Sequence, residues 1–202
     1  MTAGLRERKK LATRLALHQA ALELVAERGL DGVSVDDIAA RADVSPRTFF
    51  NYFSTKDEAV LGLDPTAAER QVAAFRVRPA TESPVQAMRA VARAQAEEMA
   101  GETELWPLRL TVIEQHPVLV GRLAASFGAA ERALAVAIAE RTGTRLDADV
   151  YPGLLAATAG AAIRAALHLW GHAGDFTASL PDLVDSAWDV LAAGLPAPPR
   201  RR

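Results

Sequence analysis

The chain of 202 residues contains no cysteine, which excludes disulfide bonds, thiolate metal sites and cysteine nucleophiles. Aromatic residues account for only 5% of the sequence. Half of the residues are nevertheless hydrophobic and alanine is abundant, a composition that favours closely packed helices. No segment has the alternating pattern of a β-strand. The sequence therefore predicts an all-α protein.

The sequence also has no excess of positive charge, no apolar leader and no membrane-spanning run. Its net charge is −2, so any contact with nucleic acid must come from a local cluster of basic residues. The N-terminus lacks the apolar region of a signal peptide. The longest uncharged stretch, 150–163, contains a proline and two glycines and is shorter than the ~20 residues that span a bilayer. We expect a soluble, cytoplasmic protein that makes no membrane contact.

Motifs of catalysis and metal binding are missing as well. The sequence contains no glycine-rich phosphate loop and no HExxH spacing. His168 and His172 lie one helical turn apart, which is a chelating spacing, but a third ligand is not evident. We expect no enzymatic activity, no metal ion and no cofactor.

The first quarter of the chain contains a helix-turn-helix pattern. Ser34, followed three residues later by Asp37, has the spacing of a capping box. Asp43 then stands at the turn, and aspartate tolerates a left-handed conformation better than most residues. The Ser-Pro pair at 45–46 caps and begins a second helix, which we expect to end at 52–53.

Polar residues of this second helix are the candidates for contact with DNA. Four side chains point outward and can donate to base edges or phosphates: Arg47, Thr48, Asn51 and Tyr52. Nearby, Phe49 and Phe53 are expected to fill the core.

The N-terminus is locally basic. Five basic residues face one acid, Glu7, so the local charge is +4; the basic residues are Arg6, Arg8, Lys9, Lys10 and Arg14. This run can bind phosphate or enter a minor groove, and a solvated chain start is the alternative.

The remaining segments predict a second helical domain. The first helix is expected at 5–28, and a connecting helix at about 55–76, interrupted at Asp64-Pro65. We place the DNA-binding head at 1–57, the second domain at 77–195 and a disordered tail at 196–202. The second domain is predicted to contain helices at 84–99, 105–115, 117–141, 147–172 and 180–193.

The head resembles the tetracycline-repressor (TetR) family of bacterial transcription factors. The matching segments are Thr13-Arg14, Leu17, AALELVAERG (20–29), SVDDIAARADVS (34–45), RTFFNYF (47–53) and TKDE (55–58). The resemblance implies base contacts for Arg47, Thr48 and Asn51. It also implies phosphate contacts for Ser34, Ser45, Tyr52 and Lys56. Arg14 is a further candidate for DNA binding, because the basic run to which it belongs lies just ahead of this motif. Two positions depart from the family pattern: Asp43 replaces a common glycine, and Phe50 replaces a tyrosine whose hydroxyl could reach phosphate.

The second domain resembles the ligand domain of mycofactocin-type regulators through the segment LWPLRLTVIEQHPVLVGRL (105–123). Several relatives of that type sense fatty acyl-CoA thioesters, which makes a small apolar or amphiphilic effector the expected ligand. The run LLAATAGAAIRAA (154–166) has small residues on more than one helix face. We therefore predict a homodimer, in which the helices at 147–172 and 180–193 pair with their symmetry mates.

Apolar residues and embedded polar residues of the second domain are the candidates for the ligand pocket. They are Trp106, Arg109, Leu110, Ile113, His116, Phe127, Arg164 and His168. Ordinary core packing is the alternative for the apolar members. For Arg164 the alternative is an internal salt bridge with an acid such as Glu114 or Asp149.

These features predict a homodimeric transcriptional repressor that a small ligand releases from its DNA operator. The alternative is a helix-turn-helix dimer whose second domain docks a protein partner and binds no small molecule.

Overall fold

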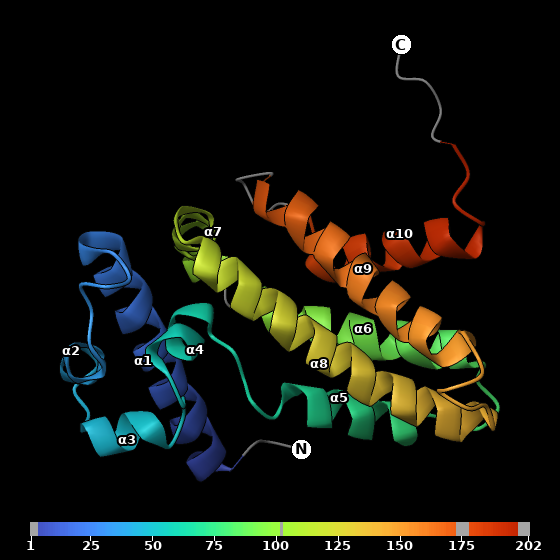
Figure 1. The fold of residues 1–202 in the computed structure, drawn as a ribbon, viewed down its shortest axis with the longest axis horizontal. Coiled ribbons are helices and arrows are strands. Elements are labelled where there is room, and N and C mark those ends of the chain that lie inside the picture. Colours follow the sequence, from blue (N-terminus) through green and yellow to red (C-terminus); the bar gives the residue numbers. More distant parts are fainter. Residues whose placement is uncertain (1–3, 102, 173–177, 198–202) are drawn as a thin grey trace. The chain divides into compact units, whose positions relative to one another are not determined.

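The computed structural model of the protein describes residues 4–101, 103–172 and 178–197. Secondary structure within these residues is entirely helical, which confirms the predicted class (Figure 1). The helices are α1 Leu5–Arg28, α2 Val35–Arg41, α3 Pro46–Phe50, α4 Lys56–Leu61, α5 Ala67–Arg76, α6 Pro84–Ala100, a 3₁₀ turn Thr103–Leu105, α7 Trp106–Gln115, α8 Pro117–Thr142, α9 Tyr151–His172 and α10 Leu180–Ala192. The predicted disordered tail falls mostly on residues 198–202, outside the described residues.

The chain forms two compact units, and their division differs from the predicted boundary near residue 77. Unit 1 contains residues 1–67 and 104–126; unit 2 contains residues 68–103 and 127–202. Unit 1 therefore contains the helix-turn-helix head together with α7 and the first turns of α8. Val112 and Leu119, both fully buried, belong to the same core as the helix-turn-helix.

Local capping interactions build the helix-turn-helix as the sequence predicts. The Ser34 hydroxyl accepts from the Asp37 N–H at 3.1 Å, and the Asp37 carboxylate accepts from the Ser34 N–H at 2.9 Å, which completes the capping box. Asp43 has a φ of 53°, the left-handed turn conformation expected for it. Ser45 caps α3 by accepting from the Thr48 N–H. This helix ends at Phe50, earlier than predicted.

The first three helices close over an aromatic core. Phe49 is fully buried and Phe53 is 2% exposed, which confirms both as core residues. The predicted break in the connecting helix is also present, because α4 ends at Leu61 and is capped by Gly62 in a left-handed conformation. The chain resumes as α5 five residues later.

In unit 2, α6, α9 and α10 pack against one another (Figure 1). Arg89 of α6 binds Asp185 at 2.7 Å and Asp189 at 2.5 Å, which ties the last helix to α6. The Arg141 guanidinium donates to three carbonyl groups of the segment 78–82. These charge-assisted contacts hold the linker between α5 and α6 against the end of α8.

The helix predicted from residue 147 begins at Tyr151 instead. The Arg145 N–H donates to the Asp149 carboxylate at 2.8 Å, and the Arg145 guanidinium binds Asp147, so the preceding residues form a turn. From Tyr151 to Gly171, α9 is long and apolar enough to cross a membrane, but only 39% of its most apolar window is buried in the protein. Length and composition alone are weak evidence for a membrane span, since core helices of soluble proteins pass the same criterion.

A strip of apolar residues on α9 remains exposed in the single chain. We call it the α9 strip; it consists of Leu154, Ala157, Ala161, Ala165 and Leu169. Leu154 is 63% exposed and Leu169 is 59% exposed. The adjacent α10 leaves Val190 45% exposed. The α9 strip contains three alanines, and the opposite face of α9, which packs inside unit 2, also contains alanines. The prediction of small residues on more than one face of this helix is therefore confirmed.

Candidate nucleic-acid interface

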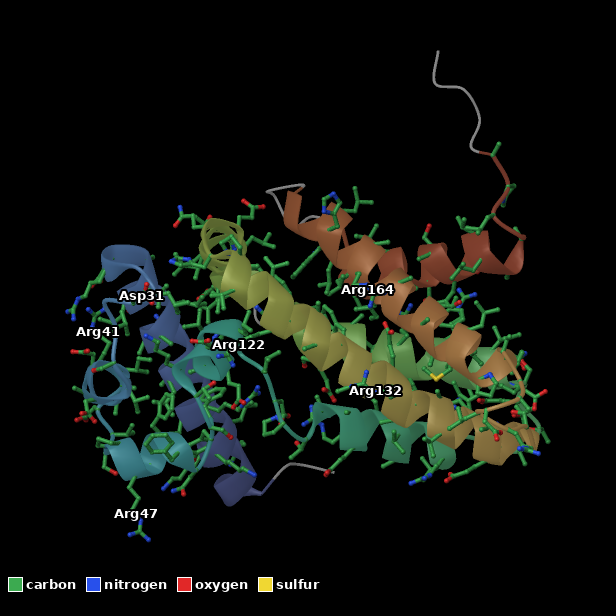
Figure 2. The ribbon with its side chains drawn as sticks, viewed as in Figure 1. Asp31, Arg41, Arg47, Arg122, Arg132 and Arg164 are labelled. Atoms are coloured by element: carbon green, nitrogen blue, oxygen red, sulfur yellow. The ribbon has the colours of Figure 1, made fainter. Side chains whose placement is uncertain are left out.

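The outward surface of α3 carries the predicted base-contacting residues. Because Phe49 anchors the inner side of this short helix, Arg47 and Asn51 are left exposed to solvent. Figure 2 shows the Arg47 side chain extending away from the ribbon. Thr48 is half-buried, and its Oγ1 lies 2.9 Å from the Ser45 hydroxyl. Tyr52 is half-buried against the head core.

The two capping serines lie exposed at the beginnings of α2 and α3. Both hydroxyls already accept from a backbone N–H, and the Ser34 hydroxyl also donates to the Asp37 carboxylate. A phosphate at either serine would therefore compete with, or share, an existing capping bond. The phosphate contacts of Ser34 and Ser45 stay predictions.

Lys56, which is expected to bind phosphate, makes hydrogen bonds inside the head. Its Nζ donates to the Leu30 carbonyl at 2.7 Å and to the Val33 carbonyl at 3.0 Å. An ammonium group has three N–H donors, so two of the three are occupied. Any substitution of Lys56 would loosen the connection between α1 and α2 as well as remove a charge.

Arg14 also makes contacts inside the head, and its contact with DNA stays a prediction. Its Nη2 donates to the Gly62 carbonyl at 2.6 Å, and its guanidinium lies 5.5 Å from the centre of the Phe53 ring. The side chain therefore stabilises the end of α4. Exposed cations of the basic run remain available on α1, at Arg8, Lys9 and Lys10.

His18 lies in the core beside Arg14 and is 3% exposed. Its Nδ1 is 2.7 Å from the Ala59 carbonyl oxygen, so this nitrogen donates and Nε2 is unprotonated in the neutral ring. Burial lowers the pKa of His18 to about 4, helped by the positive charges of Arg109 and Arg14 and opposed by the hydrogen bond to Ala59. The ring packs so closely against Gly62 that a Cβ there would lie 2.9 Å from it.

His116, which is predicted to line the ligand pocket, joins the corner between α7 and α8 to the end of α1. Its Nδ1 donates to the Val112 carbonyl at 2.8 Å, and its Nε2 accepts from the Leu30 N–H at 3.2 Å. The backbone N–H of Leu30 is thus bound by His116, and its carbonyl oxygen is bound by Lys56. Nothing in the local sequence predicts this contact, because its partners are 86 residues apart.

A second contact fixes α8 to the head. Arg122 Nε lies 2.6 Å from a carboxylate oxygen of Asp57, and Asp57 is only 7% exposed. Because a buried carboxylate requires a partner, this ion pair explains why an acid is tolerated in the first turn of α4 inside the head.

The eight predicted ligand residues are divided between the two units, and their role as a ligand pocket stays a prediction. Five of them belong to unit 1, namely Trp106, Arg109, Leu110, Ile113 and His116, and three belong to unit 2, namely Phe127, Arg164 and His168. Trp106 is 6% exposed, and the Arg109 guanidinium lies 4.7 Å from the centre of its ring. A shallow groove of unit 2 lies at the end of α8, and it is lined by Val136, Ala139, Glu140 and residues 143–147.

Arg164 forms an internal salt bridge, which is the alternative to a ligand contact given above. Its partner is Glu131, and the sequence suggested Glu114 or Asp149. Arg164 Nη1 lies 2.7 Å from the Glu131 carboxylate on α8, and its guanidinium is 5.6 Å from the centre of the Phe127 ring. Gly160 makes room for this pair, since a Cβ there would collide with the Glu131 carboxylate. His168, one turn after Arg164, is exposed on α9.

A capped helix-turn-helix with an exposed arginine on its second helix, followed by a larger helical region, defines a class of DNA-binding regulators. Comparison with protein families agrees: residues 17–61 match the model described as bacterial regulatory proteins, tetR family, and residues 82–196 match the MftR C-terminal domain. The chain belongs to the TetR family of transcriptional regulators. Regulators of this family bind operator DNA, act as dimers and respond to small-molecule effectors.

Two relatives align over almost the whole chain. The HTH-type transcriptional regulator TcmR of Streptomyces glaucescens is 35% identical over 98% of this chain and 91% of its own length. The regulator MftR of Mycobacterium tuberculosis is 31% identical over 93% of each chain.

Solved structures share the fold at lower identity. SmeT, the repressor of a multidrug efflux pump of Stenotrophomonas maltophilia, has a TM-score of 0.54 and 20% identity, covering 93% of this chain and 97% of SmeT. FadR of Bacillus subtilis, solved in complex with stearoyl-CoA, has a TM-score of 0.52 and 18% identity, covering 89% of this chain and 98% of FadR.

Proposed function

We propose that the protein is a cytoplasmic, homodimeric transcriptional repressor, without enzymatic activity, that a small apolar or amphiphilic ligand releases from its operator. The observation that carries this proposal is the geometry of α3, which leaves Arg47 and Asn51 exposed on a helix-turn-helix whose inner side is fixed by Phe49. An arginine in that position can donate two hydrogen bonds to guanine, and an asparagine can donate one hydrogen bond to adenine N7 and accept another from its N6 amino group.

The α9 strip supports the homodimer. A recognition helix of five residues contacts too few bases for useful specificity, so two copies are needed on neighbouring half-sites. The alanines of the strip allow two helix backbones to approach closely across a two-fold axis. Arg164 and His168 are exposed on the same side of α9 as the strip, so they also belong to the surface proposed for this interface, while a ligand contact of either residue stays a prediction.

The candidate effectors are acyl-CoA thioesters. FadR of Bacillus subtilis, which has the same fold, was solved with stearoyl-CoA, and the C-terminal half of this chain matches the MftR domain model. Release requires only a small change in head spacing, because half-sites lie about 34–36 Å apart or at a multiple of that distance.

Replacement of Arg47 by alanine tests the DNA contact. Arg47→Ala should weaken operator binding by ~1–3 kcal/mol and relax the preference at one base pair, because a bidentate contact is lost without disturbance of the core. The measurement is a gel-shift titration on a duplex selected from a random library by the full-length protein, at one fixed salt concentration. Arg8→Ala is the matched control, which should weaken binding to all sequences alike. Unchanged affinity of Arg47→Ala would remove Arg47 from the interface.

Thermal unfolding with and without stearoyl-CoA separates the effector proposal from its alternative. A ligand present at 100 times its Kd stabilises the folded state by ~2.7 kcal/mol, so the unfolding temperature should rise and the operator complex should dissociate. Coenzyme A without the acyl chain is the control. If no acyl-CoA or other amphiphile shifts the unfolding temperature, the alternative of a protein partner docking on the second domain is favoured.

A further inference from the structure

Phe50 is an exposed aromatic residue at the end of the recognition helix. It is 58% exposed, whereas its neighbour Phe49 is fully buried. The two rings meet edge to face with their centres 5.5 Å apart and their planes at 86°. The Phe50 ring is therefore held in place by a core residue while most of its surface remains open to solvent.

Exposure alone does not indicate function, since single apolar side chains are common on protein surfaces. The position of Phe50 is more informative. Arg47 lies one helical turn before it and is exposed, and Asn51 follows it and is exposed as well. The ring thus lies on the same outward surface as the two side chains to which base contacts are assigned.

The chemistry of the phenyl ring limits what it can contact there. It has no hydroxyl group and no other polar atom, so it can neither bind a phosphate nor exchange hydrogen bonds with a base edge. Among the groups that base pairs present in the major groove, the apolar one is the C5-methyl of thymine. Contact with that methyl would bury apolar surface on both partners.

We propose that Phe50 determines specificity by packing against a thymine methyl group beside the bases contacted by Arg47 and Asn51. This inference rests on the proposed DNA-binding function. It assigns to each half-site one T·A base pair that is recognised by apolar contact alone.

Substitution of deoxyuridine for thymine tests the contact, because it removes only the methyl group. In a duplex selected by the full-length protein, each thymine is replaced in turn, and binding is measured by fluorescence anisotropy. At one position per half-site the wild-type protein should bind about four-fold more weakly, the value expected for one buried methyl group, and about 15-fold more weakly when both half-sites are changed. Phe50→Ala should bind the thymine and deoxyuridine duplexes equally, whereas Phe50→Leu should keep part of the difference.

Two controls make the outcomes distinguishable. Arg47→Ala should bind all duplexes more weakly but keep the thymine preference, and Val118→Ala, another exposed apolar residue in unit 1, should behave as wild type. If no duplex is selected from the library, the proposed function fails. If a duplex is bound but no thymine shows a difference that depends on Phe50, the inference is overturned and the proposed function stands.

Discussion

Ala157→Glu should convert the protein into a monomer and weaken operator binding by about 100-fold or more, since two linked heads bind far more tightly than one. Ala157 lies in the α9 strip and is exposed in the single chain, so the substitution leaves the core of unit 2 intact. In the proposed dimer the α9 strip packs against the partner subunit. A carboxylate introduced there would be removed from water without a partner.

The measurement is sedimentation velocity at micromolar concentration, followed by titration of the selected operator duplex. Ala94→Glu is the matched control, because Ala94 is an exposed alanine in the interior of α6, within the same unit. It should remain dimeric with unchanged affinity. A dimeric Ala157→Glu protein would place the interface on another surface, and a monomeric wild type would exclude the homodimer.

The helix-turn-helix could be predicted from the sequence because its determinants are local. Ser34 and Asp37 are three residues apart, Ser45 caps the helix that follows it, and Asp43 supplies the turn without help from distant residues. The break after α4 was predictable for the same reason, since a proline and a glycine mark it.

The basic residues of the head show what could not be predicted. Arg14 and Lys56 look like phosphate ligands in a sequence, because a charged head group on a long stem is normally solvated. In the structure each donates to a carbonyl group brought close by tertiary packing: Gly62 for Arg14, and Leu30 and Val33 for Lys56. These carbonyl groups are 23 to 48 residues away from the cations in the chain, so the spacing of residues in the sequence does not predict the contacts.

The same limitation applies to the second domain. The segment around His116 was expected to form a ligand pocket because polar groups on apolar helices suggest a site. Its Nε2 is occupied by the Leu30 N–H, and α7 completes the core of the head. The apolar periodicity of the sequence predicts that these helices exist. The unit to which each helix belongs depends on which apolar faces pack together. An amphipathic sequence pattern does not specify the partner helix.

Acidification from pH 7 to pH 5 should lower the free energy of unfolding by about 2 kcal/mol through His18 alone. The pKa of His18 is lowered to about 4 in the folded protein by burial, whereas the unfolded chain has the ordinary value of 6.5. Between pH 6.5 and pH 4, His18 is therefore mostly protonated in the unfolded state and mostly neutral in the folded state. Stability is complete above pH 6.5 and is lost progressively as the pH falls toward 4, where the loss reaches about 3 kcal/mol.

The interval between pH 7 and pH 5 isolates this histidine from the carboxylates. Asp37 and Glu82, whose pKa values are lowered in the folded state, also destabilise the protein when they become protonated. Their losses begin only below about pH 5, because the unfolded pKa of a carboxyl group is near 4. Urea unfolding of the full chain at a series of pH values above 5 therefore measures the contribution of His18 without the losses from the carboxylates.

His18→Asn should flatten this dependence. An asparagine amide can donate to the Ala59 carbonyl as Nδ1 does, and it does not titrate. The variant should be less stable than the wild type at pH 7, because it leaves space where the ring packs against Gly62, and the difference should shrink or reverse at pH 5. His168→Asn, on the exposed side of α9, should leave most of the dependence in place because His18 is still buried. A His18→Asn protein that lost as much stability as the wild type between pH 7 and 5 would show that the proton is taken up elsewhere.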